Sequence, residues 1–273
     1  MSDWESYLKN NSEKFVSELI EFVNIPSVSA DLSYKEDVRK AGMWVANRLK
    51  TAGAENVKVM ETGGHPVVYG DWLHAGPEKP TIMIYGHFDV QPADPFELWD
   101  SDPFDAKIRD DIIYGRGASD DKGGMLIPIL SFEALLTSNG SLPVNVKFFF
   151  EGQEEILSPQ LPEFIAKHKS LLTCDMLFSA DGLQWAADEA MMVMGLKGLV
   201  GIEIELKGPK GDQHSGLHGG AIQNPIMALS HLIASMKNTE GRITVDGFYD
   251  DVLELLDDEK EEIAAVPYHE ENY

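Results

Sequence analysis

The sequence has few of the features that mark secreted and membrane proteins. Cys174 is the one cysteine among 273 residues, so the chain cannot form an internal disulfide. The first residues contain neither the basic stretch nor the apolar run of a signal peptide. No apolar run approaches the ~20 residues that a membrane-spanning helix needs. We therefore expect a protein of the cytoplasm.

Positive charge is also scarce. The chain has 22 lysines and arginines against 46 aspartates and glutamates, a formal net charge of −24. Such a charge argues against nucleic acid and anionic membranes as partners, because both repel it. It suits a protein that concentrates carboxylates around cations. The apolar fraction of 43% is ordinary, so the chain can build a hydrophobic core.

Helical and strand patterns alternate through the first part of the chain, which predicts an α/β fold. Pro128 lies inside one expected helix, so we expect that helix to begin late or to bend. From residue 198 the pattern changes: residues 200–206 alternate between apolar and polar, which predicts a half-exposed antiparallel strand. The pattern places a domain boundary there, with a first domain over 1–198 and a second over 199–273. Helices are predicted over 3–23, 35–51, 125–138 and 161–172, and strands over 57–60, 66–73, 81–85, 144–150 and 174–179.

A histidine and an aspartate follow the buried strand expected at 81–85. His87 and Asp89 are two residues apart, so in an extended chain they point to the same side. Ligands of α/β proteins bind at the carboxyl ends of the strands, and a neutral imidazole is a good zinc ligand there. A histidine that caps the strand beside a solvated aspartate is the alternative.

Acidic residues recur at three more junctions, at Asp120–Asp121, Glu154–Glu155 and Asp181. The first pair lies in the glycine-rich loop 115–124, which could also suggest a phosphate loop. Two adjacent aspartates would repel a phosphate, and no Walker pattern is present. Any one junction could be a solvated acidic loop. Four junctions in order on one α/β sheet favour a metal site.

Together these motifs resemble a family of di-zinc peptidases. The family includes carnosinases, cytosolic non-specific dipeptidases, glutamate carboxypeptidase, acetylornithine deacetylase and succinyl-diaminopimelate desuccinylase, and the chain looks most similar to the dipeptidase branch. The resemblance implies a mostly parallel mixed sheet flanked by helices, with an inserted α+β lid or dimerisation domain. The residues that carry it are Gly86-His87-Phe88-Asp89, Gly115 to Gly123, Glu151 to Glu155, Asp181 and His214-Ser215-Gly216.

The resemblance also implies the roles of single residues. His87 and Asp181 would bind one metal ion, Asp120 would bridge two, and Glu155 would bind the second. The ions would be zinc, with manganese or cobalt as alternatives. The catalytic residues would be Glu154, as the general base on a water that the metals activate and later the acid to the leaving amine, and Asp89, which would orient His87.

The family likeness carries three further expectations. The peptide bond between Asp120 and Asp121 should be cis. The protein should form a homodimer through the second domain, in which His214 reaches the partner's site and stabilises the oxyanion. Family members are longer and have a last histidine ligand near their C-terminus, so we interpret the chain as an N-terminal part with a partial second domain. In that case the second metal should bind weakly, and the chain as given should show little activity.

One departure and several alternatives remain. The family usually has Ser-Gly-Ser after its paired glutamates, where this chain has Ile156-Leu157-Ser158-Pro159. The leading hypothesis is hydrolysis of the amide bond of dipeptides or short peptides. A deacylase of N-acyl amino acids and a non-catalytic, truncated cation-binding or dimerisation module are the alternatives. An esterase that uses Ser215 with His214 is disfavoured, because no Gly-x-Ser-x-Gly elbow is present.

Overall fold

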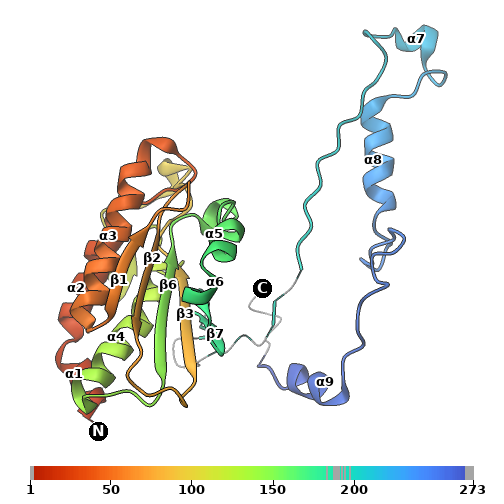
Figure 1. Ribbon diagram of the computed structural model, residues 1–273. Helices are drawn as coiled ribbons and strands as arrows, with labels where there is room; N and C mark the ends of the chain where they lie inside the picture. The colour runs from red at the N-terminus through yellow and green to blue at the C-terminus, as the bar shows by residue number, and fades with distance from the viewer. Residues whose placement is uncertain are drawn as a thin grey trace. The chain divides into compact units, whose positions relative to one another are not determined.

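The computed structural model describes residues 3–182, 184–186, 191, 193, 195–196 and 198–267. The chain divides into two compact units, Met1–Leu196 and Lys197–Tyr273, and each is treated by itself. Among the described helices, none combines the length and the apolar character that crossing a bilayer requires. The first unit holds the sheet (Figure 1), and the four polar junctions all lie within its residues.

A five-stranded sheet organises the first unit, in the order β1-β2-β6-β3-β7. The β1–β2 and β2–β6 pairs are antiparallel, and the β6–β3 and β3–β7 pairs are parallel. Four strands therefore point one way and β2 points the other, which confirms the expected mixed, mostly parallel sheet. The strands are β1 (Glu55–Met60), β2 (Val67–Trp72), β3 (Thr81–His87), β6 (Asn145–Glu151) and β7 (Met176–Ser179).

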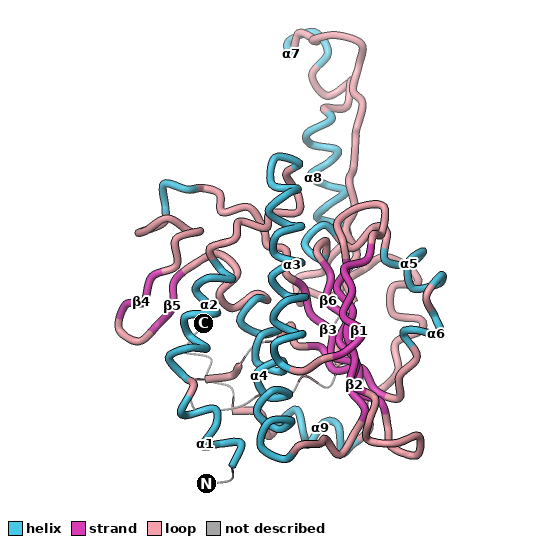
Figure 2. Tube along the Cα trace, turned by 60° about the vertical axis from the view of Figure 1, so that its left-hand side comes forward, coloured by secondary structure: helices cyan, strands magenta, loops and turns pink. Residues whose placement is uncertain are grey.

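Helices cover both faces of the sheet because side chains alternate along each strand. On β6, Phe148 and Phe150 belong to the larger core cluster, whereas Phe149 belongs to the smaller cluster on the opposite face. The larger cluster packs under α2, α3 and α4, and Phe164 of α5 packs on the smaller one. Figure 2 shows α3 and α4 on one side of the sheet and α5 and α6 on the other. The helices of this unit are α1 (Asp3–Asn10), α2 (Ser12–Val23), α3 (Lys35–Ala52), α4 (Lys122–Asn139), α5 (Leu161–Lys167) and α6 (Lys169–Leu172).

Two predicted helices differ from those observed. The helix expected over 3–23 is broken at Asn11, whose φ of −108° and ψ of 8° leave the helical region between α1 and α2. The helix that contains Pro128 begins at Lys122, so the late start, one of the two outcomes expected, is wrong. Proline removes one backbone donor and its ring crowds the carbonyl four residues earlier, a cost that packing of a buried helix face can offset. Short elements complete the unit: η1 (Leu32–Tyr34), η2 (Phe96–Leu98), η3 (Glu154–Ile156) and the hairpin of β4 (Lys107–Arg109) and β5 (Ile112–Tyr114).

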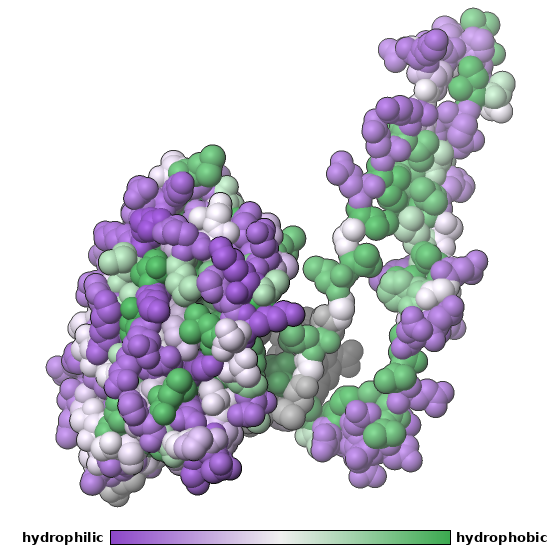
Figure 3. Space-filling view, in the orientation of Figure 1, coloured by the Kyte–Doolittle hydropathy of each residue, from purple (hydrophilic) through white to green (hydrophobic). Residues whose placement is uncertain are grey.

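The second unit contains α7 (Ser215–His218), α8 (Pro225–Ser235) and α9 (Asp257–Ala264). Asn224 caps α8 by accepting hydrogen bonds from the backbone N–H groups of Ile226 and Met227. Apolar side chains of α8 lie at the surface of this unit (Figure 3), and Ile226 is 73% exposed.

The prediction of a strand over residues 200–206 is wrong. The segment has no strand pairing within the described part of the chain. Its alternating pattern specifies which side chains share a face, but a strand forms only when a neighbouring segment supplies hydrogen-bonding partners.

Candidate metal centre

The parallel strands bring three of the four polar junctions to one edge of the sheet. His87 is the last residue of β3, and Asp181 lies two residues beyond β7. Glu154 and Glu155 lie in η3, just after β6. Since β3 lies between β6 and β7, its carboxyl end is flanked by the other two. The fourth junction, Asp120–Asp121, directly precedes α4 and reaches the same edge from the side.

The structure groups three of the predicted ligands tightly. His87 Nε2 lies 3.1 Å from Asp120 Oδ1 and 3.7 Å from Asp181 Oδ2. One ligand atom from each residue falls within 4.8 Å of the others. The imidazole is fully buried, and its Nε2 makes no hydrogen bond of acceptable geometry among the described residues. A buried nitrogen that faces two carboxylates without bonding to either is arranged for a shared cation.

His87 offers the correct face to such a cation. Its Nδ1 lies 3.1 Å from the backbone carbonyl oxygen of Asp89, so Nδ1–H can donate there and leave the Nε2 lone pair free. Burial alone would lower the pKa of His87, but the carboxylates of Asp120, Asp181 and Asp89 raise it above its ordinary value. A divalent ion bound at Nε2 would compete with a proton for the same lone pair.

The Asp89 carboxylate, predicted to orient His87, makes its hydrogen bonds elsewhere. Its Oδ1 lies 3.5 Å from His87 Nδ1, at the edge of useful contact. Its two oxygens instead accept hydrogen bonds from the backbone N–H groups of Glu154 and Glu155, each at 3.1 Å. The side chain is completely buried. Asp89 therefore lies between His87, which its backbone carbonyl contacts, and the acidic turn after β6, which its carboxylate holds.

The two glutamates lie beside the His87 cluster and outside its tightest group. Gln91 donates from Nε2 to both the carbonyl oxygen and Oε2 of Glu155, at 3.0 and 2.8 Å. Burial raises the pKa of Glu154, and the negative charges of Glu155, Asp181 and Asp89 raise it further. A raised pKa brings a carboxylate closer to the range in which it can accept and return a proton near neutral pH.

Sequence reasoning gave no role to Asp121, the second member of the aspartate pair. The bond between Asp120 and Asp121 is cis, as the family resemblance predicted. The buried carboxylate of Asp121 accepts from the backbone N–H of His87 at 3.1 Å. Burial raises its pKa to about 7. The adjacent glycines make room, since a Cβ at Gly86 or Gly124 would lie 2.6 or 2.2 Å from its oxygens. These glycines are the sequence signal from which the close packing around the Asp121 carboxylate could have been predicted.

A buried lysine anchors the same loop. Lys122 is completely buried, and its Nζ donates to the carbonyl oxygens of Phe22 and Ile25 at 3.1 and 2.6 Å. These carbonyls lie at the C-terminal end of α2, where a cation is favoured. Burial lowers the pKa of Lys122 to about 7, against the opposing effect of Asp89. The lysine thus ties the start of α4, next to Asp120, to a fixed point in the core.

The turn after Glu155 accommodates the departure from the Ser-Gly-Ser pattern. Leu157 has φ 67° and ψ 26°, in the left-handed region that favours glycine, and it is 90% exposed. Ser158 follows at φ 47°, and its hydroxyl donates to Glu151 Oε1 at 2.9 Å. The turn keeps a conformation suited to glycine although the residue has a side chain.

We expect Leu157→Gly to stabilise the protein. A residue with a Cβ pays about 1–2 kcal/mol in this region, whereas the greater freedom of glycine when unfolded costs about 0.5–1 kcal/mol. The free energy of unfolding should therefore rise by up to about 1.5 kcal/mol, measured by urea denaturation. Leu32→Gly is the control, because Leu32 is 83% exposed in η1 without a positive φ. It should lose stability, and a loss for Leu157→Gly as well would contradict the argument.

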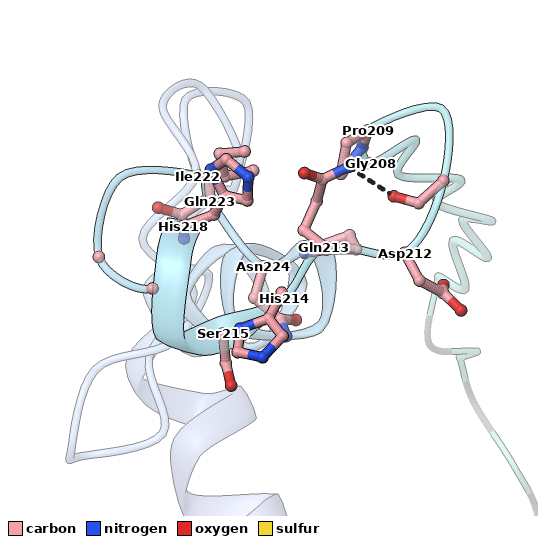
Figure 4. A pocket seen from close by; sticks show the side chains of 14 residues that line it. Gly208, Pro209, Asp212, Gln213, His214, Ser215, His218, Ile222, Gln223 and Asn224 are labelled. Atoms are coloured by element: carbon pink, nitrogen blue, oxygen red, sulfur yellow. Dashed lines mark hydrogen bonds between the residues drawn. The ribbon is translucent and has the colours of Figure 1, made fainter.

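His214 lies in the second unit, and its position is described within that unit. It lines a pocket of about 610 Å³ together with Asp212, Gln213, Ser215 and His218. Figure 4 shows the His214 ring beside Ser215 at the start of α7. Gly216 N–H donates to His214 Nδ1 at 3.0 Å. The side chains of His214 and Ser215 are on the surface of the unit, so solvent or a partner can reach them.

The donor set of the first unit fits a divalent cation. One imidazole nitrogen and several carboxylate oxygens are ligands that zinc, manganese and cobalt accept. Around His87 gather the carboxylates of Asp89, Asp120, Asp121 and Asp181, with the buried Lys122 as a partial counter-charge. A cation bound between His87 Nε2 and the two nearest carboxylates would relieve their mutual repulsion.

Comparison with known proteins assigns both units. Residues 83–225 match the model of peptidase family M20/M25/M40, and residues 194–268 match a peptidase dimerisation domain. A Cys-Gly metallodipeptidase DUG1 of Candida albicans is 31% identical over 93% of this chain and 56% of its own length. A human Beta-Ala-His dipeptidase is 32% identical over 98% of this chain and 55% of its own length. The chain thus spans a little over half the length of these relatives.

Solved structures agree in fold. The M20 family metallo-carboxypeptidase Sso-CP2 from Sulfolobus solfataricus superposes with a TM-score of 0.80 at 34% identity, over 94% of this chain and 57% of that one. Human carnosine dipeptidase 1 gives a TM-score of 0.72 at 28% identity, over 98% and 59%. With the family match covering more than half of its residues, the chain belongs to peptidase family M20/M25/M40.

Proposed function

We propose that this chain provides the metal-binding half of a dipeptidase, which hydrolyses the amide bond of dipeptides or short peptides. The observation that carries the proposal is the buried His87 Nε2, which faces Asp120 and Asp181 without a hydrogen bond. The names of the relatives support the substrate class, since they include Cys-Gly and Beta-Ala-His dipeptidases. The cytoplasmic location expected from the sequence is part of the proposal.

His87 and Asp181 would hold one divalent ion, Asp120 would share it with a second, and Glu155 would hold that second ion. Zinc is the proposed metal. When bound, such ions supply Lewis-acid chemistry, which acidifies water and polarises a carbonyl. Gln91 donates to Glu155 Oε2 at 2.8 Å and to the Glu155 carbonyl oxygen at 3.0 Å, so it would help to orient the carboxylate that holds the second ion.

Glu154 would move the proton. Its carboxylate takes a proton from the attacking water, whose oxygen forms a bond to the scissile carbonyl carbon. The same proton then passes to the amide nitrogen as the carbon–nitrogen bond breaks, so that an acid and an amine leave. Asp89 holds the Glu154 backbone at 3.1 Å, which fixes the base relative to His87. Asp121 holds the His87 backbone from the other side.

The second unit would complete the site in a homodimer. Its match to a peptidase dimerisation domain supports this, as do the exposed apolar side chains of α8. His214 would reach the partner's site and donate a hydrogen bond to the carbonyl oxygen as that oxygen gains negative charge. We place the division between the catalytic and lid domains at residue 198, as the sequence pattern indicates.

The test combines metal binding with hydrolysis. The chain is stripped with a chelator and reloaded with zinc, manganese or cobalt, and binding is measured by calorimetry. Release of free amino acids from Cys-Gly and β-Ala-His is followed for the chain and for any longer product of the same gene. Hydrolysis should appear only in the metal-loaded forms. Hydrolysis of N-acetyl amino acids with dipeptides untouched would favour a deacylase, and metal binding without any hydrolysis a non-catalytic module.

A further inference from the structure

The His-Ser-Gly motif contains its own device for orienting the histidine. Gly216 N–H donates to His214 Nδ1 at 3.0 Å, across two residues. The backbone carbonyl of His214 accepts from Leu217 N–H and His218 N–H, both at 3.0 Å, and so begins α7. The ring and the first turn of the helix are therefore held to the same short segment.

A nitrogen of a neutral imidazole that accepts a hydrogen bond carries no proton of its own. The bond from Gly216 therefore assigns the proton of neutral His214 to Nε2. That nitrogen is then a donor, on a side chain that lines the pocket. With the opposite tautomer, Nε2 would be an acceptor and would repel a carbonyl oxygen.

The absence of a side chain at residue 216 makes the bond possible. A Cβ built on Gly216 would lie 2.8 Å from His214 Cε1 and 3.1 Å from Nδ1. Real Cβ atoms do not approach so closely, so the ring would have to swing away from the N–H. Because His214 is exposed, the ring can move into solvent without disrupting a core. A substitution should then break the bond and leave the fold intact.

We propose that Gly216 is a positioning residue, whose backbone N–H fixes His214 as the Nε2–H tautomer, ready to donate to a substrate oxygen. This inference rests on the proposed function for the use of that donor. The tautomer itself depends only on groups within residues 214–216.

The test is a long-range ¹H–¹⁵N correlation spectrum of the whole chain labelled with ¹⁵N-histidine. It is recorded in alkaline buffer, at a pH above which the ¹⁵N shifts of the ring no longer change, so that the neutral form is observed. A His214→Asn variant assigns the signals. In the wild type, Nδ1 should resonate as an acceptor nitrogen and Nε2 as a protonated one. In Gly216→Ala the two signals should move toward each other, as two tautomers exchange.

Gly211→Ala is the matched control, because its Cβ would meet nothing within 4 Å and its φ is not positive. Its His214 signals should equal those of the wild type. A protonated Nδ1 in the wild type, or identical signals in the wild type and Gly216→Ala, would overturn the inference. The wild-type spectrum alone shows whether Nδ1 is protonated, even if a variant misfolds. The spectrum requires neither metal nor substrate, so it tests the tautomer independently of hydrolysis. If the tautomer is as proposed and the protein has no hydrolytic activity, the proposed function is contradicted and the inference about Gly216 is not.

Discussion

In a full-length enzyme that hydrolyses dipeptides, replacing Glu154 with glutamine should lower the rate of hydrolysis by about 10²- to 10⁴-fold and leave the metal content unchanged. Glutamine keeps the shape of the side chain and cannot accept the proton. Glu154 lies outside the cluster in which His87, Asp120 and Asp181 approach within 4.8 Å. Loss of its charge should therefore affect proton transfer and spare the ion between those three residues.

The measurement pairs steady-state rates with atomic emission analysis of the same samples. Glu163→Gln is the control, an equal change at an exposed position on α5. It should retain both rate and metal. A Glu154→Gln protein that hydrolyses dipeptides at the wild-type rate would remove Glu154 from the mechanism. One that loses its metal would instead make Glu154 a ligand.

The sequence predicts much of the central sheet. The strand expected over 144–150 is observed as Asn145–Glu151, and the one over 81–85 extends to His87. Strand β6 is buried throughout and β3 is partly buried, and both are rich in β-branched or aromatic residues, so burial, propensity and length agree. The segment 200–206 has the alternation and lacks the partner. The local sequence pattern therefore predicts a strand correctly where neighbouring strands enclose the segment. It fails where the segment has no neighbouring strand to pair with.

The sequence likewise predicts part of the site and misses part of it. The motif marked His87, Asp120 and Asp181, which the structure brings together. It did not show that Asp121 bonds to the His87 backbone, or that Gln91 holds Glu155. These contacts depend on the directions of side chains across the edge of the sheet. Spacing along the sequence can indicate that residues share an edge, but not which atoms meet there.

Asp89 is the residue for which that difference matters most. The resemblance assigns it to His87, whereas the structure connects it to the turn of Glu154 and Glu155 as well. Asp89→Asn should therefore weaken two parts of the site at once. Two backbone N–H groups now donate to the Asp89 carboxylate, one to each oxygen. The NH₂ group of asparagine would face one of them and cannot accept its hydrogen bond, so one buried donor would be left without a partner. Such a loss costs about 1–3 kcal/mol of stability.

Metal affinity should fall in Asp89→Asn by about 10- to 100-fold, the usual range when an outer partner of a metal site is changed. Asparagine keeps the backbone carbonyl that His87 Nδ1 faces, so the loss should come from the missing negative charge beside His87 and from the weakened turn of Glu154 and Glu155. Calorimetry with zinc measures the affinity, and urea denaturation of the metal-free chain measures the stability. Asp71→Asn is the matched control, because Asp71 is a buried carboxylate that accepts from Tyr69 and Asn56 at the far end of β2. It should lose stability and keep its affinity for zinc. Equal losses of affinity in the two variants would show that general destabilisation, and not the bridge from His87 to the acidic turn, sets the strength of metal binding.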